Sequence, residues 1–135
     1  MTFSSLWNWR GTESVGGFPA PLMDEDSASP GNSTDAVRVW QPPAGTAGNL
    51  QISGELRKRY SWCGDAAIGE VVRIRNGVQV ATLWSATLSP STRSAIYNVS
   101  TPLAAGDAIG FKVKRGGTAA SCDNLFFSPL IEFTP

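Results

Sequence analysis

The segment RKRYSWCGD, residues 57 to 65, gathers side chains that are able to bind a ligand. It carries three consecutive cations, Arg57, Lys58 and Arg59, followed by two large aromatic residues, Tyr60 and Trp62. Aromatic rings offer flat apolar faces, and guanidinium groups hold carboxylates through paired hydrogen bonds. The alternative is a solvated basic edge beside a tryptophan that packs inward, and the residues alone favour neither interpretation.

The cations and the rings reach one surface only if the backbone bends. If a strand continued past Leu56, alternation would place Arg57 and Arg59 on one side and Tyr60 and Trp62 on the other. A loop in this segment removes that separation. We therefore expect a loop that carries both kinds of side chain.

The chain has two cysteines, Cys63 and Cys122, and no histidine, so a zinc site has no ligand set. Two isolated cysteines in a chain rich in Thr and Gly indicate a disulfide and an oxidising compartment. Two separate buried thiols are the alternative. A disulfide would bring the segment RGGTAASCDN beside RYSWCGD. The predicted ligand site is then a composite of two loops, with Tyr60, Trp62, Arg57, Arg59, Arg115, Asp123 and Asn124.

Two further groups near the N-terminus are candidate sites. Trp7 and Trp9 share a face if their segment is extended, and with Arg10 they form a second candidate platform. A packed N-terminal strap is the more common role for such residues. The consecutive acids Asp24, Glu25 and Asp26 offer oxygen ligands for a structural calcium ion, although a solvated acidic turn is the favoured interpretation.

Composition excludes several classes of function. The 135 residues carry 11 Lys and Arg against 11 Asp and Glu, whereas a general nucleic-acid binder is clearly basic. No apolar run approaches the roughly eighteen residues that a membrane span requires. Without histidine, neither a Ser-His-Asp nor a Cys-His arrangement is available. A carboxylate pair or a tyrosine with arginine could still act on sugars, but neither signal rises above chance, so we expect no enzyme.

The elements that must position these residues are short β-strands. Alternating apolar and polar residues are separated by Gly and Pro, and Asn76-Gly77 is a strong signal for a two-residue hairpin. No segment after residue 36 shows helical periodicity. We predict a single all-β domain, an antiparallel, jelly-roll-like β-sandwich in 36–135 with an irregular N-terminal strap in 1–35. The expected strands lie within 36–40, 49–56, 68–75, 78–84, 93–101, 107–115 and 125–133.

The order of several short motifs resembles a known class of module. Phe3-Ser4 precedes Trp7 or Trp9, and VWQPPAG, LQISGEL, CGDAAIGEVVRIRNG and LAAGDAIGFKV follow in order before Asp123. In this the chain resembles the β-sandwich accessory modules of secreted bacterial polysaccharide-active enzymes and surface proteins. The resemblance spans most of the chain and implies a jelly roll that binds carbohydrate. The segment RKRYSWC stands where such modules often carry a short glycine-rich turn.

Residues and resemblance together predict a non-catalytic module that binds a polysaccharide or glycan. Tyr60 and Trp62 would stack on sugar rings, while the arginines would contact hydroxyls or carboxylates. We expect a secreted protein, extracellular or at the cell surface and part of a larger chain, with its signal peptide absent from this sequence. We expect no cofactor beyond the candidate calcium ion. The alternative is a structural or adhesive module of a surface or fibre protein that binds another protein.

Overall fold

The computed structural model describes residues 9–15, 18–23, 27–60, 62–117, 120 and 122–135, with side chains described from residue 27 onward. These residues form β-strands joined by turns and loops. In the part of the chain that is described, no helix has the length and apolar character needed to cross a membrane. The strands are β1 (Trp9–Val15), β2 (Phe18–Met23), β3 (Ser27–Ser29), β4 (Ala36–Trp40), β5 (Gly48–Lys58), β6 (Ala67–Arg75), β7 (Val78–Leu88), β8 (Ser94–Leu103), β9 (Asp107–Arg115), β10 (Leu125–Phe127) and β11 (Leu130–Thr134).

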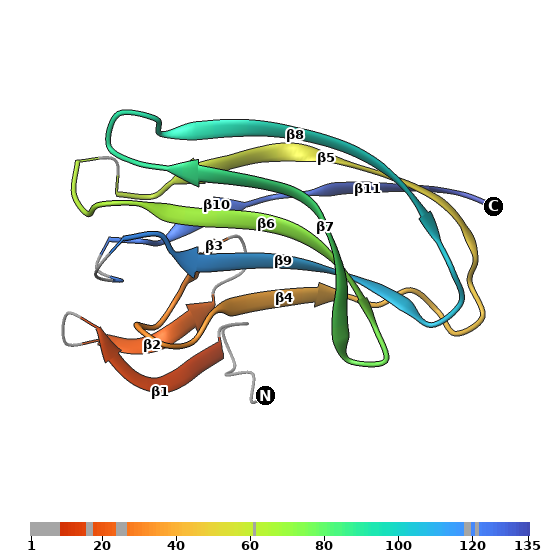
Figure 1. The fold of residues 1–135 in the computed structure, drawn as a ribbon, viewed down its shortest axis with the longest axis horizontal. Helices are drawn as coiled ribbons and strands as arrows, with labels where there is room; N and C mark the ends of the chain where they lie inside the picture. The colour runs from red at the N-terminus through yellow and green to blue at the C-terminus, as the bar shows by residue number, and fades with distance from the viewer. Residues whose placement is uncertain (1–8, 16–17, 24–26, 61, 118–119, 121) are drawn as a thin grey trace.

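The strands form two antiparallel sheets that face each other (Figure 1). The four-stranded sheet has the order β4-β9-β6-β7. In the seven-stranded sheet β5 is central, with β8 on one side and β10 and β11, one after the other, on its opposite side. From β3 to β10 the chain changes sheet at every connection except the β6–β7 hairpin. This arrangement, with β3-β10-β5-β8 facing β4-β9-β6-β7, confirms the predicted jelly-roll sandwich.

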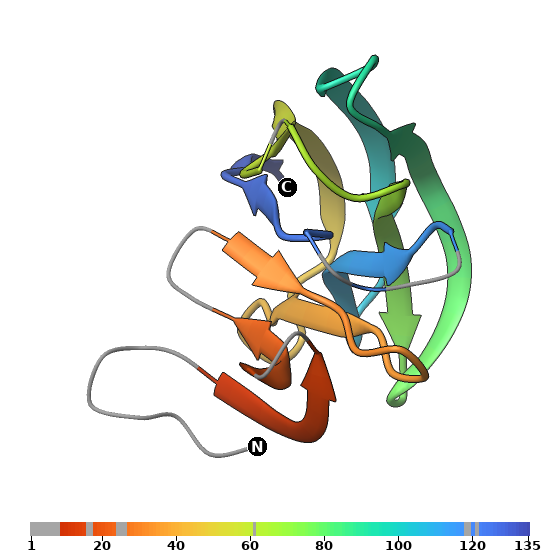
Figure 2. The same cartoon turned by 90° about the vertical axis from the view of Figure 1, so that its left-hand side faces the viewer.

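The N-terminal segment contributes regular strands to the larger sheet. β1 and β2 form an antiparallel hairpin, and β3 joins that hairpin to β10. Sequence reasoning expected only short extended pieces here, because Pro19 and Pro21 interrupt the pattern. The structure accommodates both prolines because β3 pairs with β2 only at Leu22 and Met23, beyond them. Figure 2 shows this hairpin beside the two stacked sheets.

The predicted hairpin at Asn76-Gly77 is present between β6 and β7. Arg75 pairs with Val78, and the two residues between them have φ angles of 53° and 76°. Positive φ at both central positions is the property of a type I′ turn, and Asn and Gly adopt it most readily. The sequence signal therefore fixed both the position and the type of this connection.

The core lies between the sheets and is built from the inward face of each strand. On β9, Ile109, Phe111 and Val113 are buried, as the alternation predicted. Trp84 is partly buried and packs against the core, with its ring centroid 5.2 Å from that of Tyr97. The buried core includes Leu50, Ile52, Leu56, Val71, Leu88, Tyr97, Leu103, Ile109, Phe111, Val113, Leu125 and Phe127. This core holds the sheets rigidly enough to support loops at both ends of the sandwich.

Candidate functional site

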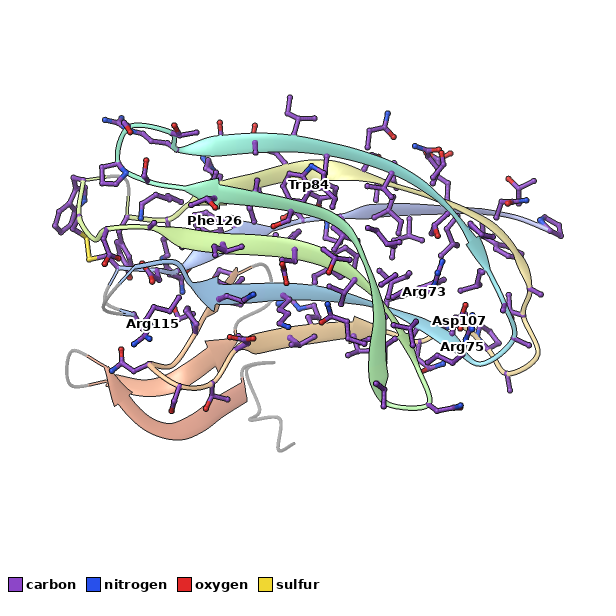
Figure 3. The ribbon with its side chains drawn as sticks, viewed as in Figure 1. Arg73, Arg75, Trp84, Asp107, Arg115 and Phe126 are labelled. Atoms are coloured by element: carbon purple, nitrogen blue, oxygen red, sulfur yellow. A yellow bond between two sulfur atoms is a disulfide. The ribbon has the colours of Figure 1, made fainter. Side chains whose placement is uncertain are left out.

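A disulfide joins Cys63 and Cys122, which confirms the predicted pairing. The two Cα atoms lie 5.9 Å apart although the residues are 59 positions apart in the chain. The bond links the β5–β6 loop to the β9–β10 loop at one end of the sandwich, at the left of Figure 3. Such a bond is typical of proteins that fold in an oxidising, extracellular environment.

The two aromatic residues of the β5–β6 loop are exposed to solvent. Trp62 is 79% exposed and Tyr60 is 39% exposed. Their ring centroids lie 6.4 Å apart, and the ring planes meet at 67°. The alternative in which the tryptophan packs inward beside the disulfide is therefore wrong. Two differently oriented ring faces are available at this end of the molecule.

A third ring, Phe126 on β10, adjoins the cations of the same loop. The guanidinium carbon Cζ of Arg57 lies 4.9 Å from the Phe126 ring centroid, and that of Arg59 lies 5.8 Å from it. Arg59 also lies 5.7 Å from the Tyr60 ring centroid. The chain bends after β5, and the arginines and the rings therefore reach one surface, as the predicted site requires. We call Arg57, Arg59, Tyr60, Trp62 and Phe126 the aromatic–arginine surface.

Sequence reasoning missed Phe126, although a signal for it was present. In LFF the neighbours Leu125 and Phe127 are buried, and alternation then directs Phe126 to the outer face of β10. Antiparallel pairing places Phe126 directly opposite Arg57 on β5. The contact between this arginine and the ring is therefore a cross-strand pair, which only the strand register could reveal.

The third cation of the segment, Lys58, has a structural role. Its side chain is only 3% exposed, and its ammonium Nζ donates a hydrogen bond to the Cys122 carbonyl at 3.3 Å. Its backbone N–H donates to the Arg93 carbonyl at 2.9 Å. The next backbone N–H, that of Arg59, donates to the Asn124 carbonyl at 3.0 Å. These bonds hold the exposed loop against the two loops beside it.

Asp123 and Asn124 were predicted to contact the ligand, and their burial places them beneath the surface instead. They are 1% and 4% exposed. The Asn124 amide Nδ2 donates to Ser29 Oγ at 2.6 Å, which ties β10 to β3. No described residue donates a hydrogen bond to either carboxyl oxygen of Asp123. Both residues support the loops from below, because their polar atoms are closed off from any ligand.

The environment of Asp123 favours its neutral form. Burial and, to a smaller extent, the negative charge of Asp65 raise the pKa of this carboxyl from 3.8 to about 7. The charges of Lys58 and Arg115 act in the opposite direction with smaller effect, as does the nearby backbone N–H of Gly116, which donates its hydrogen bond to the Ala66 carbonyl at 2.9 Å. Because the carboxyl is buried, its raised pKa bears on stability and gives no acid that could protonate a ligand.

Arg115 is exposed at the end of β9, on the four-stranded sheet. Figure 3 shows Arg115 and Phe126 in the half of the molecule that holds the disulfide, on different sheets. The structure thus brings four of the seven predicted side chains together, adds Phe126 to them, and places Arg115 on the other sheet.

The remaining predicted residues cannot be placed in a site. Trp7 and the acidic residues Asp24, Glu25 and Asp26 lie outside the described residues, and Trp9 and Arg10 lie on β1, whose side chains are not described. The candidate calcium site and the second aromatic platform therefore stay predictions. Among the described residues, no group of three or more acids or cysteines is arranged to hold a metal ion.

A separate polar network lies at the opposite end of the sandwich (Figure 3). Asp107 is fully buried and accepts two hydrogen bonds from Arg75, at 2.6 and 3.0 Å. The Ala104 backbone N–H also donates to Asp107, at 3.0 Å, so this carboxylate caps the β8–β9 turn. The Arg75 guanidinium holds the pKa of the Asp107 carboxyl below its usual value. This network closes the β8–β9 turn, and Arg75 donates through Nε and Nη2 to Asp107 and not to a ligand.

A groove of about 420 Å³ lies on the outer face of the four-stranded sheet. Its described lining contains no aromatic side chain and is mainly aliphatic and amide: Val37, Val39, Gln41, Val72, Ile74, Asn76, Gly77, Gln79, Gly106, Ala108 and Lys112. Ring stacking is therefore available at the aromatic–arginine surface and not in this groove.

Comparison with known proteins adds no assignment. A scan of protein-family models and a search of curated protein sequences both found no match to this chain.

Proposed function

We propose that this protein binds a polysaccharide or glycan, without turning it over, through the aromatic–arginine surface. The observation that carries the proposal is the exposure of Trp62, which is 79% accessible beside Tyr60 on a loop held by a disulfide. A large apolar ring left in water beside other rings marks a binding surface. The C–H face of a sugar ring stacks on such aromatic faces, and guanidinium groups hydrogen-bond its oxygens.

The loop that carries the rings is restrained on both sides of Ser61. The disulfide, the buried Lys58 ammonium and the backbone bond from Arg59 to Asn124 all restrain it. Preorganisation lowers the entropy cost of binding. One small surface still gives weak affinity, so a repeating polymer and several modules in one secreted protein would supply avidity. The resemblance to accessory modules of polysaccharide-active enzymes supports the same ligand class.

The test compares two exposed apolar side chains. Trp62 is 79% and Val78 is 62% exposed, but Val78 begins β7 opposite Arg75, at the other end of the sandwich from the aromatic–arginine surface. In affinity gels that contain a panel of polysaccharides, Trp62→Ala should remove the retardation, with binding weakened by about tenfold or more. Val78→Ala should leave it intact, and both variants should unfold near the wild-type temperature. Retention of full binding by Trp62→Ala contradicts the proposal.

A protein-binding module is the second candidate, because two exposed aliphatic side chains flank β5. Ile96 and Leu130, 79% and 58% exposed, pair with neighbouring positions of β5 from opposite sides. Exposed aliphatic side chains close together on a sheet face favour contact with another protein. Sedimentation that shows mass rising with concentration, lost in Ile96→Ala and without any glycan binding, would favour this function over the first.

A further inference from the structure

We propose that the ligand of the aromatic–arginine surface is an acidic saccharide, one that carries carboxylate or sulfate groups. This inference rests on the proposed function and goes beyond it by naming the class of saccharide. A neutral sugar needs only the two rings of the loop. The arrangement of the arginines around a third ring requires a further explanation.

The two guanidinium groups are held on one ring. Arg57 and Arg59 lie 4.9 and 5.8 Å from the centroid of Phe126; Arg57 is the last residue but one of β5, and Arg59 is the first residue after it. Contact with an aromatic face fixes the plane of a guanidinium group while leaving N–H donors at its edge. Both guanidinium carbons lie within about one Debye length of the Phe126 centroid at physiological salt, so their fields add at this position. An oxyanion there is attracted by both.

Among the described residues, the carboxylate that contacts Arg57 is a weak competitor for that position. Glu55 lies 3.9 Å from its Nε, and the two side chains are 54% and 59% exposed. An ion pair at this distance and exposure contributes little stability. A ligand carboxylate or sulfate that binds in the paired, two-hydrogen-bond geometry gains more than the Glu55 contact loses. The site is therefore open to exchange of one anion for another.

Positive charge is concentrated at this end of a chain that is neutral as a whole. The β5–β6, β7–β8 and β9–β10 loops with their flanking residues, within 55–66, 88–94 and 115–127, carry more cations than acids. One of these acids, Asp123, is buried and largely neutral below its raised pKa of about 7. The cations are Arg57, Lys58, Arg59, Arg93 and Arg115, and the acids are Glu55, Asp65 and Asp123.

An acidic polypeptide would use the same charges, but it would not use the rings in the same way. Trp62 has most of its surface in solvent. A strand of acidic side chains offers no flat C–H face to this ring, whereas each pyranose of an acidic polysaccharide offers both a face and an anion. The combination of exposed indole and paired arginines therefore favours the saccharide.

The experiment measures binding to matched pairs of polymers that differ in charge. Polygalacturonate is compared with its methyl ester, and dextran sulfate with dextran, at low and at high sodium chloride. We expect the acidic member of at least one pair to bind about tenfold or more tightly than its neutral partner. The preference should shrink as salt rises. The pair that shows it identifies carboxylate or sulfate as the recognised group.

Variants separate the arginines from the tryptophan. Arg57→Gln with Arg59→Gln should remove the preference for the acidic polymer, and replacement of both by Lys should restore only part of it because the planar donor pair is lost. Lys114→Gln, which removes a cation on the four-stranded sheet that lies 3.9 Å from Glu70, is the matched control and should change nothing. Thermal unfolding checks that each variant folds.

Three outcomes overturn the inference. Equal binding of the methyl ester and the acid, lost in Trp62→Ala, leaves the proposed function standing and removes only the acidic class. Binding of poly-glutamate as tight as that of polygalacturonate and independent of Trp62 shows a general anion surface. Failure of every polysaccharide to bind removes the proposed function itself, and the inference with it.

Discussion

Replacement of Asp123 by Asn should stabilise the protein at neutral and alkaline pH. The Asp123 carboxyl is 1% exposed, and no described residue donates a hydrogen bond to it. Its pKa is about 7 in the folded protein, against 3.8 for an ordinary aspartate. The folded state therefore holds a proton that the unfolded state releases between these two values. The contribution of Asp123 to the free energy of unfolding therefore falls as pH rises from about 4 to about 7 and is constant above that range.

The size of the effect follows from the shift. One pKa unit corresponds to about 1.4 kcal/mol, so ionisation of this group lowers the free energy of unfolding by about 4 kcal/mol above pH 7. Asn has the same shape and no charge to bury. Asp123→Asn should therefore be more stable than wild type at pH 8 by a few kcal/mol and similar to it at pH 4.

Urea unfolding of the oxidised protein at pH 4, 5, 6, 7 and 8, followed by tryptophan fluorescence, measures this difference. The m-value should stay constant while the midpoint moves. Asp65→Asn is the companion variant. The Asp65 charge is a smaller cause of the shift than burial, so this variant should give a smaller stabilisation in the same pH range. If Asp123→Asn is less stable than wild type at pH 8, the ionised carboxyl stabilises the fold through the buried Lys58, and the reasoning fails.

Three other changes test the disulfide, the core packing and the Arg75–Asp107 ion pair. Reduction of the disulfide should lower the free energy of unfolding by about 4 kcal/mol, as chain entropy predicts for a loop of 59 residues, and should weaken saccharide binding in the same gels. Gly69→Ala should lower the free energy of unfolding by about 1–3 kcal/mol, because its added methyl group would overlap the buried Leu56 side chain. The double variant Gly69→Ala with Leu56→Val should recover part of this loss in a urea titration. Arg75→Ala should lower the melting temperature and move acid unfolding to higher pH. Because Arg75 lowers the pKa of Asp107, the ion pair stabilises the fold at pH values above 3.8, and this stabilisation is lost as pH falls through the pKa of the folded state. Unchanged acid unfolding would contradict the stabilising role of this pair.

Local patterns in the sequence were sufficient to predict the sandwich. Strict alternation in DAIGFKVKR identified β9 and its buried face, and Asn76-Gly77 identified a hairpin whose geometry needs those two residues. The hairpin of β1 and β2 escaped prediction because its strand character depends on pairing and not on an alternating pattern. Proline weakens the local signal, and only the partner strands decide whether the missing N–H matters.

The site was predictable in part, for a similar reason. The exposed loop could be proposed from residue types alone, because cations and rings in one short segment have few other uses. The contact between Phe126 and Arg57 could not be predicted, since it depends on the register between β10 and β5. Asp123 and Asn124 lie beside a cysteine of the disulfide, but adjacency along the chain does not tell which side chain turns inward. Burial of a polar residue is decided by the surrounding sheets.

The energetics of the disulfide end explain why a bond is needed there. A charged Asp123 destabilises this end by about 4 kcal/mol at neutral pH and above. Cys122 adopts a φ of 62°, a backbone conformation that costs a non-glycine residue about 1–2 kcal/mol. The constraint of the disulfide on the unfolded chain, about 4 kcal/mol, offsets most of this sum. The opposite end carries no such bond among the described residues, because Asp107 there is paired with Arg75 and its turn is closed by hydrogen bonds. Unfavourable groups thus collect beneath the aromatic–arginine surface, where a rigid loop serves binding, and the covalent link compensates for them at that place.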